Sequence, residues 1–170
     1  RLFDADMIDG IEVVNHFEFY PRVVSWCIDK GLPMFANSDE HGIISEDFQT
    51  FGHDAMFKRF RPMTLVLVDE KSQEGVKEAF LEGRTIAYTD NMFMSTEKFL
   101  IELYKACVDM KTISEGEKKN SYEYTNVSSF PFVVSVNGGG KKVIPPFSTI
   151  QFSASNQKEL QITILNTCTK

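Results

Sequence analysis

The stretch from residue 10 to residue 37, GIEVVNHFEFYPRVVSWCIDKGLPMFAN, decides the fold class of this chain. Gly10–Asn15 is rich in β-branched residues and predicts a strand. Pro21–Lys30 predicts a helix, because Pro suits the first helical position and Gly31 the position after the last. Its apolar stripe is formed by Val23, Val24, Cys27 and Ile28. Leu32–Asn37 predicts a second, buried strand, so the segment is a strand–helix–strand unit.

The same pattern recurs farther along the chain, after a loop from Ser38 to about Arg61. Thr64–Val68 predicts a buried strand, and Ser72 caps a helix over Gln73–Glu82 that Gly83 ends. A strand over Arg84–Tyr88 follows, and Ser95 caps a last helix that runs to about Met110. Strands separated by helices usually pair in parallel through right-handed crossovers, so residues 1–110 predict an α/β domain with a parallel sheet.

The pattern changes to all-β after Lys111–Asn120, a polar, turn-rich segment that we expect to be a linker. Residues 121–170 predict a small β-sandwich that resembles an immunoglobulin domain. Its expected strands are Phe130–Asn137, Lys141–Ile144, Thr149–Ser155 and Glu159–Asn166. The last two alternate polar and apolar residues, which predicts one wet and one buried face.

Composition excludes several classes of function. Lys and Arg number 18 and Asp and Glu 24, a net charge of −6, and phosphate backbones need clustered basic residues, so we expect no nucleic-acid partner. No apolar run approaches the length of a membrane span. Three widely separated cysteines lack metal-ligand spacing, and burial as small hydrophobes is the expectation for Cys27 and Cys107.

Polar residues follow two of the predicted strands, where parallel α/β folds carry their sites. Asn15 and His16 end the first strand, and Asp39 and His41 follow the second. Asp39 and His41 are two residues apart, so an extended segment would point both side chains the same way. A carboxylate and an imidazole together can hold a divalent transition metal. The alternative is that Asp39 forms an Asx-turn or caps the next element.

Other polar residues have both a functional and a structural interpretation. Glu12 lies in a strand that we expect to be buried, and either orients a neighbouring ligand or is paired within the fold. Arg61 and Arg84 either contact an oxyanion or form ordinary salt bridges. His53 is a third histidine, usually a loop residue in such a place. Asn126-Val127-Ser128 matches a glycosylation sequon, and Gly138–Gly140 predicts a hairpin turn rather than a phosphate cradle.

Three ordered blocks resemble the later part of PHP (polymerase and histidinol phosphatase) domains. The first is Ile8–Asn15 (IDGIEVVN), and the second is the strand end Asn37–His41 (NSDEH), which carries the family's S-D-x-H pattern. The third joins Arg61–Thr64 (RPMT) to Glu78–Phe80 and Gly83–Thr85. The resemblance covers about residues 6–90, and with a β-rich tail it is closest to the phosphodiesterase-type branch.

The resemblance implies the C-terminal portion of a distorted seven-stranded β/α barrel. It also implies hydrolysis of a small-molecule phosphate ester by a hydroxide that bridges two or three Zn, Mn or Fe ions. Asp39 and His41 match metal ligands of the family and are the catalytic residues that it implies. Asn15, His16 and Arg61 are candidates for contact with the substrate, and Glu12 for orienting a ligand. The family's His-x-His motif is absent from these 170 residues.

Because the chain opens at Arg1 and lacks that motif, we expect it to be part of a longer protein and inactive alone. An open half-barrel would associate with the missing N-terminal half or with another copy. A sandwich-like tail favours an exported protein, periplasmic or extracellular, over a cytoplasmic one. The alternative function is a non-catalytic α/β and β-sandwich module that binds a protein or a glycan.

Overall fold

A computed structural model describes residues 7–16, 18–42, 61–156 and 159–169 of the chain. The regular secondary structure is mostly β-sheet, with few helices. The chain forms two compact units, the first from residues 1–101 and 167–170 and the second from residues 102–166. The division therefore differs from the expected domains at 1–110 and 121–170. Strands also occupy most of the expected linker at 111–120.

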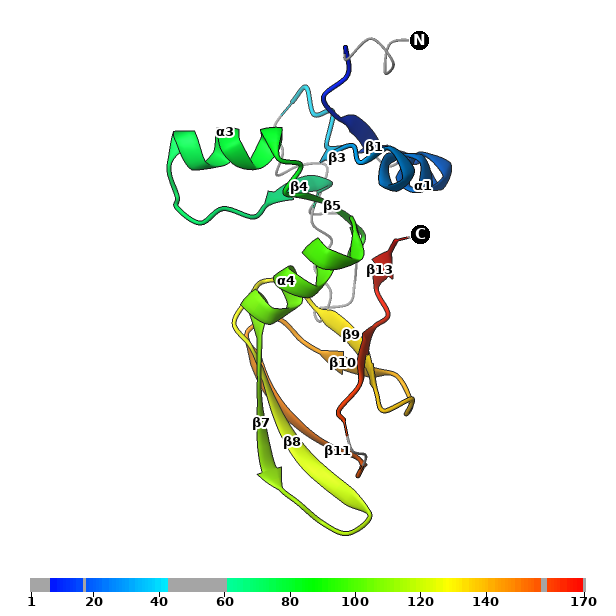
Figure 1. Ribbon diagram of the computed structural model, residues 1–170, viewed down its shortest axis with the longest axis vertical. Coiled ribbons are helices and arrows are strands. Elements are labelled where there is room, and N and C mark those ends of the chain that lie inside the picture. The colour runs from blue at the N-terminus through cyan, green and yellow to red at the C-terminus, as the bar shows by residue number, and fades with distance from the viewer. Residues whose placement is uncertain (1–6, 17, 43–60, 157–158, 170) are drawn as a thin grey trace. The chain divides into compact units, whose positions relative to one another are not determined.

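The first unit opens with the predicted strand–helix–strand segment (Figure 1). Strand β1 (Ile11–Asn15) and strand β3 (Met34–Asn37) pair in parallel, with Asn15 opposite Asn37. Helix α1 (Pro21–Lys30) joins them and ends at Gly31, whose φ of 67° lies in the left-handed region that glycine adopts without strain. A two-residue strand, β2 (Glu18–Phe19), was not predicted and pairs antiparallel with the end of β1.

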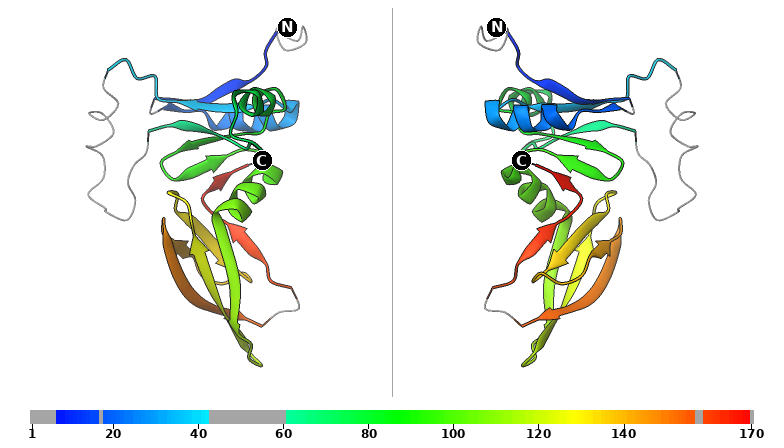
Figure 2. Two further views of the ribbon diagram at one scale, coloured as in Figure 1. Left: turned by 90° about the vertical axis from the view of Figure 1, so that its left-hand side faces the viewer. Right: turned by 90° about the vertical axis from the view of Figure 1, so that its right-hand side faces the viewer.

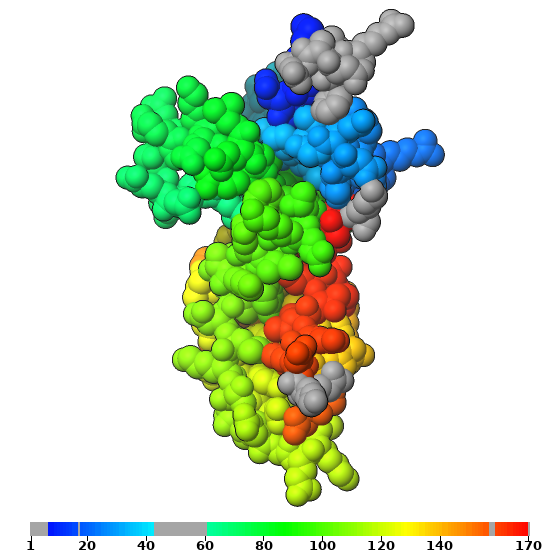
Figure 3. Space-filling view, in the orientation of Figure 1, coloured from blue at the N-terminus to red at the C-terminus, as the bar shows by residue number. Residues whose placement is uncertain are grey.

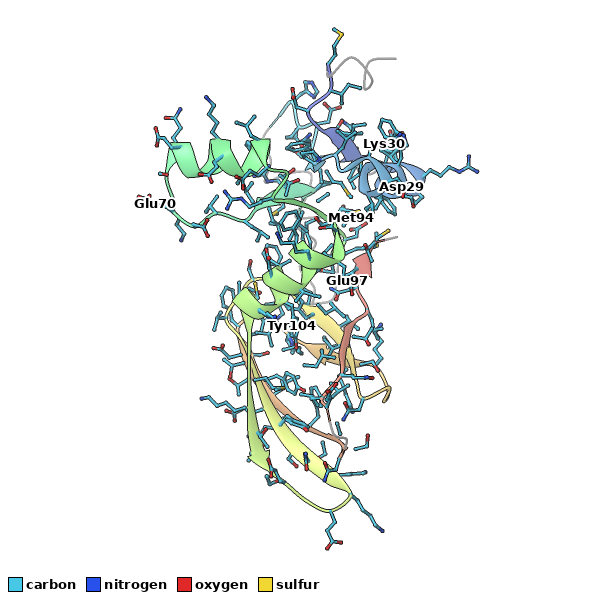
Figure 4. All side chains as sticks on the ribbon, in the orientation of Figure 1. Asp29, Lys30, Glu70, Met94, Glu97 and Tyr104 are labelled. Carbon is cyan, nitrogen blue, oxygen red and sulfur yellow. The ribbon has the colours of Figure 1, made fainter. Side chains whose placement is uncertain are left out.

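The core of this unit lies between the strands and α1, which runs along the β1–β3 pair in Figure 2. It also includes Met94, labelled in Figure 4. Cys27 is fully buried as expected, and burial raises the pKa of its thiol to about 11. Cys107 is only half-buried. The residues of the core are Val13, Val14, Val24, Cys27, Met34, Ala36, Ala87 and Met94.

A second sheet of the first unit has the order β13-β6-β5-β4. Its strands β4 (Met63–Val66), β5 (Thr85–Thr89) and β6 (Met92–Met94) pair antiparallel, so the prediction of parallel pairing is wrong here. The C-terminal strand β13 (Thr167–Cys168) pairs in parallel with β6. The described residues form open sheets of three and four strands, and no β/α barrel is seen among them.

The antiparallel pairing follows from the path of helix α3 (Gln73–Leu81). Residues 67–72 lead away from the end of β4, and the nine helical residues, about 13 Å long, lead back. Strand β5 therefore starts where β4 stops, with Thr85 opposite Val66. The predicted cap is confirmed, since Ser72 Oγ accepts a hydrogen bond from Gly75 N at 3.0 Å.

Strand β3 has a second edge that two threonine hydroxyls satisfy. In a parallel pair, alternate residues direct their backbone groups to one neighbour, and here Pro33 O and Asn37 O accept from β1 and from His16 just after it. Met34 and Ala36 therefore face away from β1. Met34 N donates to Thr85 Oγ1 at 3.2 Å, and Ala36 N donates to Thr64 Oγ1 at 3.0 Å. The Thr64 hydroxyl in turn donates to Ala36 O at 3.1 Å.

Helix α4 (Glu97–Cys107) begins in the first unit and ends in the second. The predicted cap at Ser95 is wrong, because Thr96, not Ser95, directly precedes the helix, and Thr96 O accepts the hydrogen bond from Leu100 N. The Ser95 hydroxyl donates to Thr85 O. The helix stops at Cys107, before the predicted end. Tyr104, labelled in Figure 4, packs edge-on against Phe132 at 5.3 Å between ring centroids. No helix in the described part of the chain is both long and apolar enough to cross a membrane.

The second unit consists of two three-stranded antiparallel sheets, β11-β8-β7 and β10-β9-β12. Their buried side chains include Tyr124, which stacks on Phe152 at 4.4 Å between ring centroids. Exposed polar residues alternate with less exposed apolar ones along the third predicted strand and along the fourth as far as Ile164, as expected, but only Ala154 among these apolar residues is buried. The strands are β7 (Val108–Ser114), β8 (Lys119–Asn126), β9 (Phe132–Val136), β10 (Lys142–Ile144), β11 (Ser148–Ser155) and β12 (Ile162–Ile164).

Strand β8 was missed although its buried residues alternate at Tyr122, Tyr124 and Asn126. Strand β7 was missed because it carries almost no burial pattern. Six of its seven residues are exposed, so its sequence resembles a loop. The β9–β10 turn was predicted correctly as a hairpin. Asn137 and Gly138 both have positive φ, 51° and 67°, which is the type I′ geometry favoured by Asn-Gly.

Asn126 is a buried hydrogen-bonding centre of the second unit rather than an accessible glycosylation sequon. Its side chain is 1% exposed. The amide nitrogen donates to Phe130 O at 2.7 Å, to Pro145 O at 3.0 Å and to Ile144 O at 3.4 Å. The amide oxygen accepts from the backbone N and the hydroxyl of Ser128. One side chain thus holds the end of β8 to the segments that flank β9 and β10.

Replacing Thr64 by Val should lower the free energy of unfolding by about 1–3 kcal/mol, because it leaves the Ala36 N–H and C=O without their hydroxyl partner. Urea unfolding of the 170-residue chain measures the loss. Thr64→Ser keeps the hydroxyl and is the matched control. Equal stability of the two variants would show that the hydroxyl does not stabilise β3.

Replacing Asn126 by Asp should cost at least about 3 kcal/mol, because a carboxylate oxygen would face three carbonyl oxygens in a buried place. The same unfolding measurement applies. Asn156→Asp, at an exposed position where the amide donates to a single carbonyl, should change stability far less. A small effect at both positions would contradict the role assigned to Asn126.

Candidate functional site

The polar ends of β1 and β3 lie side by side, as their parallel pairing predicts. Asn15 is in register with Asn37, and His16 N donates to Asn37 O at 2.9 Å. The ring Nδ1 of His16 lies 3.2 Å from Ser38 O. His16 therefore contacts the backbone directly before Asp39.

Glu12 connects the two strand ends through its carboxylate. Its Oε1 accepts from Asn37 Nδ2 at 2.7 Å, and its Oε2 accepts from Asn15 Nδ2 at 3.1 Å. An ionised carboxylate only accepts hydrogen bonds, so it fixes the orientation of both amides and turns their oxygens away from Glu12. Asn37 was not predicted as a site residue, although its position at the end of a predicted strand was the available signal.

The backbone turns sharply at Asp39, where φ is 51°. The segment is not extended, so the expectation that Asp39 and His41 project the same way by strand alternation is wrong. Asp and Asn tolerate this left-handed conformation better than most residues. The local side-chain bond of the turn comes from Glu40, whose Oε1 accepts from Gly42 N at 2.7 Å. Asp39 is exposed, and its carboxylate accepts no hydrogen bond within the described residues.

The hydrogen bond of His41 fixes which ring nitrogen carries the proton. Nδ1 lies 2.7 Å from Asp39 O, and a carbonyl oxygen can only accept, so neutral His41 has its proton on Nδ1. Its Nε2 then keeps the lone pair. A backbone carbonyl that holds Nδ1–H in this way is a common feature of histidines that bind metals through Nε2.

An open depression of about 500 Å³ lies beside this turn. Asp39 and Arg61 both line this depression, as they must if they belong to one site, and Asn37 lines it too. Glu12, Asn15, His16 and His41 are outside its lining. The lining residues are Ala36, Asn37, Ser38, Asp39, Glu40, Arg61, Pro62, Met63 and Thr64.

Arg84 is held in ion pairs, which is the structural interpretation of this residue. Its guanidinium nitrogens lie 3.0 Å from Asp69 Oδ2, 3.3 Å from Glu78 Oε1 and 3.3 Å from Glu82 Oε2. The Nε contact with Glu82 lacks the geometry of a hydrogen bond. With three carboxylates around it, Arg84 anchors the start of β5 and is not placed to bind an oxyanion.

No family model and no curated protein matches this sequence. The fold is similar to the crystal structure of a two-domain protein from Bacteroides vulgatus ATCC 8482 that contains a predicted PHP-like metal-dependent phosphoesterase. The two share 24% sequence identity with a TM-score of 0.81. The similarity covers 98% of this chain and 50% of that protein, so the chain spans about half of its length.

The donor chemistry at the turn fits a transition metal only in part. A carboxylate oxygen and an imidazole nitrogen suit Zn, Mn or Fe. Among the residues that the structure describes, no group of three or more His, Cys, Asp and Glu side chains could hold an ion. His53 lies outside those residues. Asp39 and His41 alone would therefore supply only part of a coordination shell.

The His41 ring should show the Nδ1–H tautomer in the absence of added metal, because its Nδ1 donates to Asp39 O. Long-range ¹⁵N–¹H correlation spectra of the 170-residue chain distinguish the two tautomers, and a His41→Gln variant assigns the signal. A neutral ring protonated on Nε2 would contradict the arrangement.

Proposed function

We propose that this chain is part of a metal-dependent phosphoesterase related to PHP domains, in which Asp39 and His41 are metal ligands. The observation that carries the proposal is the hydrogen bond from His41 Nδ1 to Asp39 O, which leaves the lone pair of Nε2 available two residues from the exposed Asp39. A depression next to this pair offers room for a substrate. The fold similarity to half of a protein with such a phosphoesterase supports the same class of function.

The residues of the site have distinct roles in this proposal. Two or three bound Zn, Mn or Fe ions would supply an activated hydroxide and offset charge on the phosphoryl group. Asp39 and His41 would hold ions, and Arg61, which shares the depression with Asp39, would bind a phosphate oxygen in the planar geometry of its guanidinium. Asn15 and His16 are proposed substrate contacts. Glu12 would hold the Asn15 and Asn37 amides in place.

The remaining ligands would come from outside the described residues. They would belong to the part of a longer protein that corresponds to the other half of the structural neighbour, or to another subunit. The phosphodiesterase-type branch and an immunoglobulin-like second unit also belong to this proposal. They fit the pair of three-stranded antiparallel sheets that follows the first unit.

A second candidate is a non-catalytic module that binds a protein or a glycan. It is favoured by one observation, that the described residues bring no three metal-ligand side chains together. Binding of Zn²⁺ or Mn²⁺ separates the candidates. The phosphoesterase proposal requires binding that depends on Asp39 and His41, and the binding-module proposal requires none.

Replacing Asp39 or His41 by Ala should each reduce hydrolysis of an aryl phosphate ester by the intact protein at least about a hundredfold, because each change removes a ligand of the reacting centre. The rate of aryl alcohol release at saturating Mn²⁺ or Zn²⁺ measures the effect. Glu102→Ala, an exposed carboxylate on α4, is the matched control and should keep the rate of the parent protein. Full activity of both ligand variants would refute the assignment of the site.

A further inference from the structure

Strand β7 has an open edge in the second unit. It is the last strand of the sheet β11-β8-β7, and β8 is its only strand partner within the described residues. Figure 1 shows it at the margin of the sheet, and the yellow-green residues of this region lie at the surface in Figure 3. Residues 109–114 are all exposed, including Met110 at 40% and Ile113 at 49%. An edge of this kind can pair with another strand.

The hydrogen-bond pattern shows which residues of β7 present backbone groups to that edge. Val127 N donates to Cys107 O at 2.9 Å, and the register continues with Asp109 opposite Thr125 and Lys111 opposite Glu123. Backbone groups alternate in direction along an antiparallel strand, so residues 107, 109 and 111 face β8. Val108, Met110 and Thr112 therefore direct their N–H and C=O groups to the open side.

The charges on β7 select one pairing with a second copy of the chain. A two-fold axis at Met110 places Asp109 opposite Lys111 of the partner subunit, and Lys111 opposite Asp109 of the partner subunit. It also places Met110 opposite Met110 of the partner subunit, and Val108 opposite Thr112 of the partner subunit. An axis at Asp109 or at Lys111 would place like charges directly opposite, which is unfavourable. Only the pairing centred on Met110 combines open backbone groups with opposite charges.

A local irregularity limits the length of this pairing. The register of β7 with β8 shifts between Thr112 and Ser114, which ends the regular strand after Thr112. The paired segment is then five residues, 108–112. A two-fold contact uses the same edge of both copies and closes after two chains.

We propose that β7 pairs antiparallel with β7 of a second copy of this chain, centred on Met110, so that two three-stranded sheets join into one of six strands. The proposal does not depend on the phosphoesterase proposal. Because the contact is short, we expect a dimer that dissociates in the micromolar range, about 10–100 µM.

The test uses the 170-residue chain and two charge variants in sedimentation equilibrium. Asp109→Lys gives two lysines on the edge and Lys111→Asp gives two aspartates, so each alone should dissociate at least about tenfold more readily than the parent. An equimolar mixture places lysine opposite aspartate at both positions and should restore a dimer. Glu102→Lys, an exposed charge change on α4, is the control and should leave the dimer unchanged.

A second measurement reports the register. It does not depend on the stability of Lys111→Asp, in which an aspartate would lie opposite Glu123 in place of a lysine. Met110→Cys lies on the proposed axis and should form an intermolecular disulfide, whereas Thr112→Cys should not. The parent chain, with Cys27, Cys107 and Cys168, gives the background. A parent chain that is monomeric at about 100 µM, a dimer unaffected by Asp109→Lys, or equal cross-linking at both positions would overturn the proposal.

Discussion

The first unit depends on one constraint, that the backbone groups on both edges of β3 need hydrogen-bond partners. One edge pairs with β1, and the other is satisfied by the hydroxyls of Thr64 and Thr85 instead of a strand ladder. A hydroxyl both donates and accepts, so Thr64 replaces one rung of a ladder by binding Ala36 N and Ala36 O together. This contact joins two sheets of the unit at one strand. The turn with Asp39 and His41 follows that strand directly, so its position depends on these side chains.

Sequence patterns predicted the elements whose packing is local. The stripe on α1, its Pro21 start and Gly31 end, and the Ser72 cap all lie within one or two turns of chain, and each was confirmed. Pairing partners were predicted less well. The antiparallel β4–β5 contact depends on the distances covered by a loop and a short helix, and β13 has only two residues, too few for any periodicity. Strand β7 is exposed, so its sequence lacks the alternation that would identify it.

The candidate site also has one feature that the sequence predicted and one that it did not. The meeting of the polar strand ends followed from parallel pairing alone, and the structure confirms it. The left-handed backbone at Asp39 was not predictable from spacing, and it replaces the expected strand geometry with a turn. That turn brings Asp39 O within 2.7 Å of the His41 ring, so the backbone rather than the Asp39 side chain determines the tautomer. The geometric reason for pairing Asp39 with His41 therefore does not hold, and their role as metal ligands stays a prediction.

The balance of charge in the depression links its residues to the proposed chemistry. Asp39 and Glu40 contribute two negative charges and Arg61 one positive charge, a local sum of −2 + 1 = −1, on a chain whose net charge is −6. Arg84 cannot offset this, because three carboxylates already surround it. A phosphate ester would be repelled by such a surface, since like charges raise the free energy of the bound state. Divalent cations held by Asp39 and His41 would reverse the sign of the local charge. Arg61 could then contribute a directional contact to a phosphate oxygen, a role that it cannot fill as the single cation of an acidic depression.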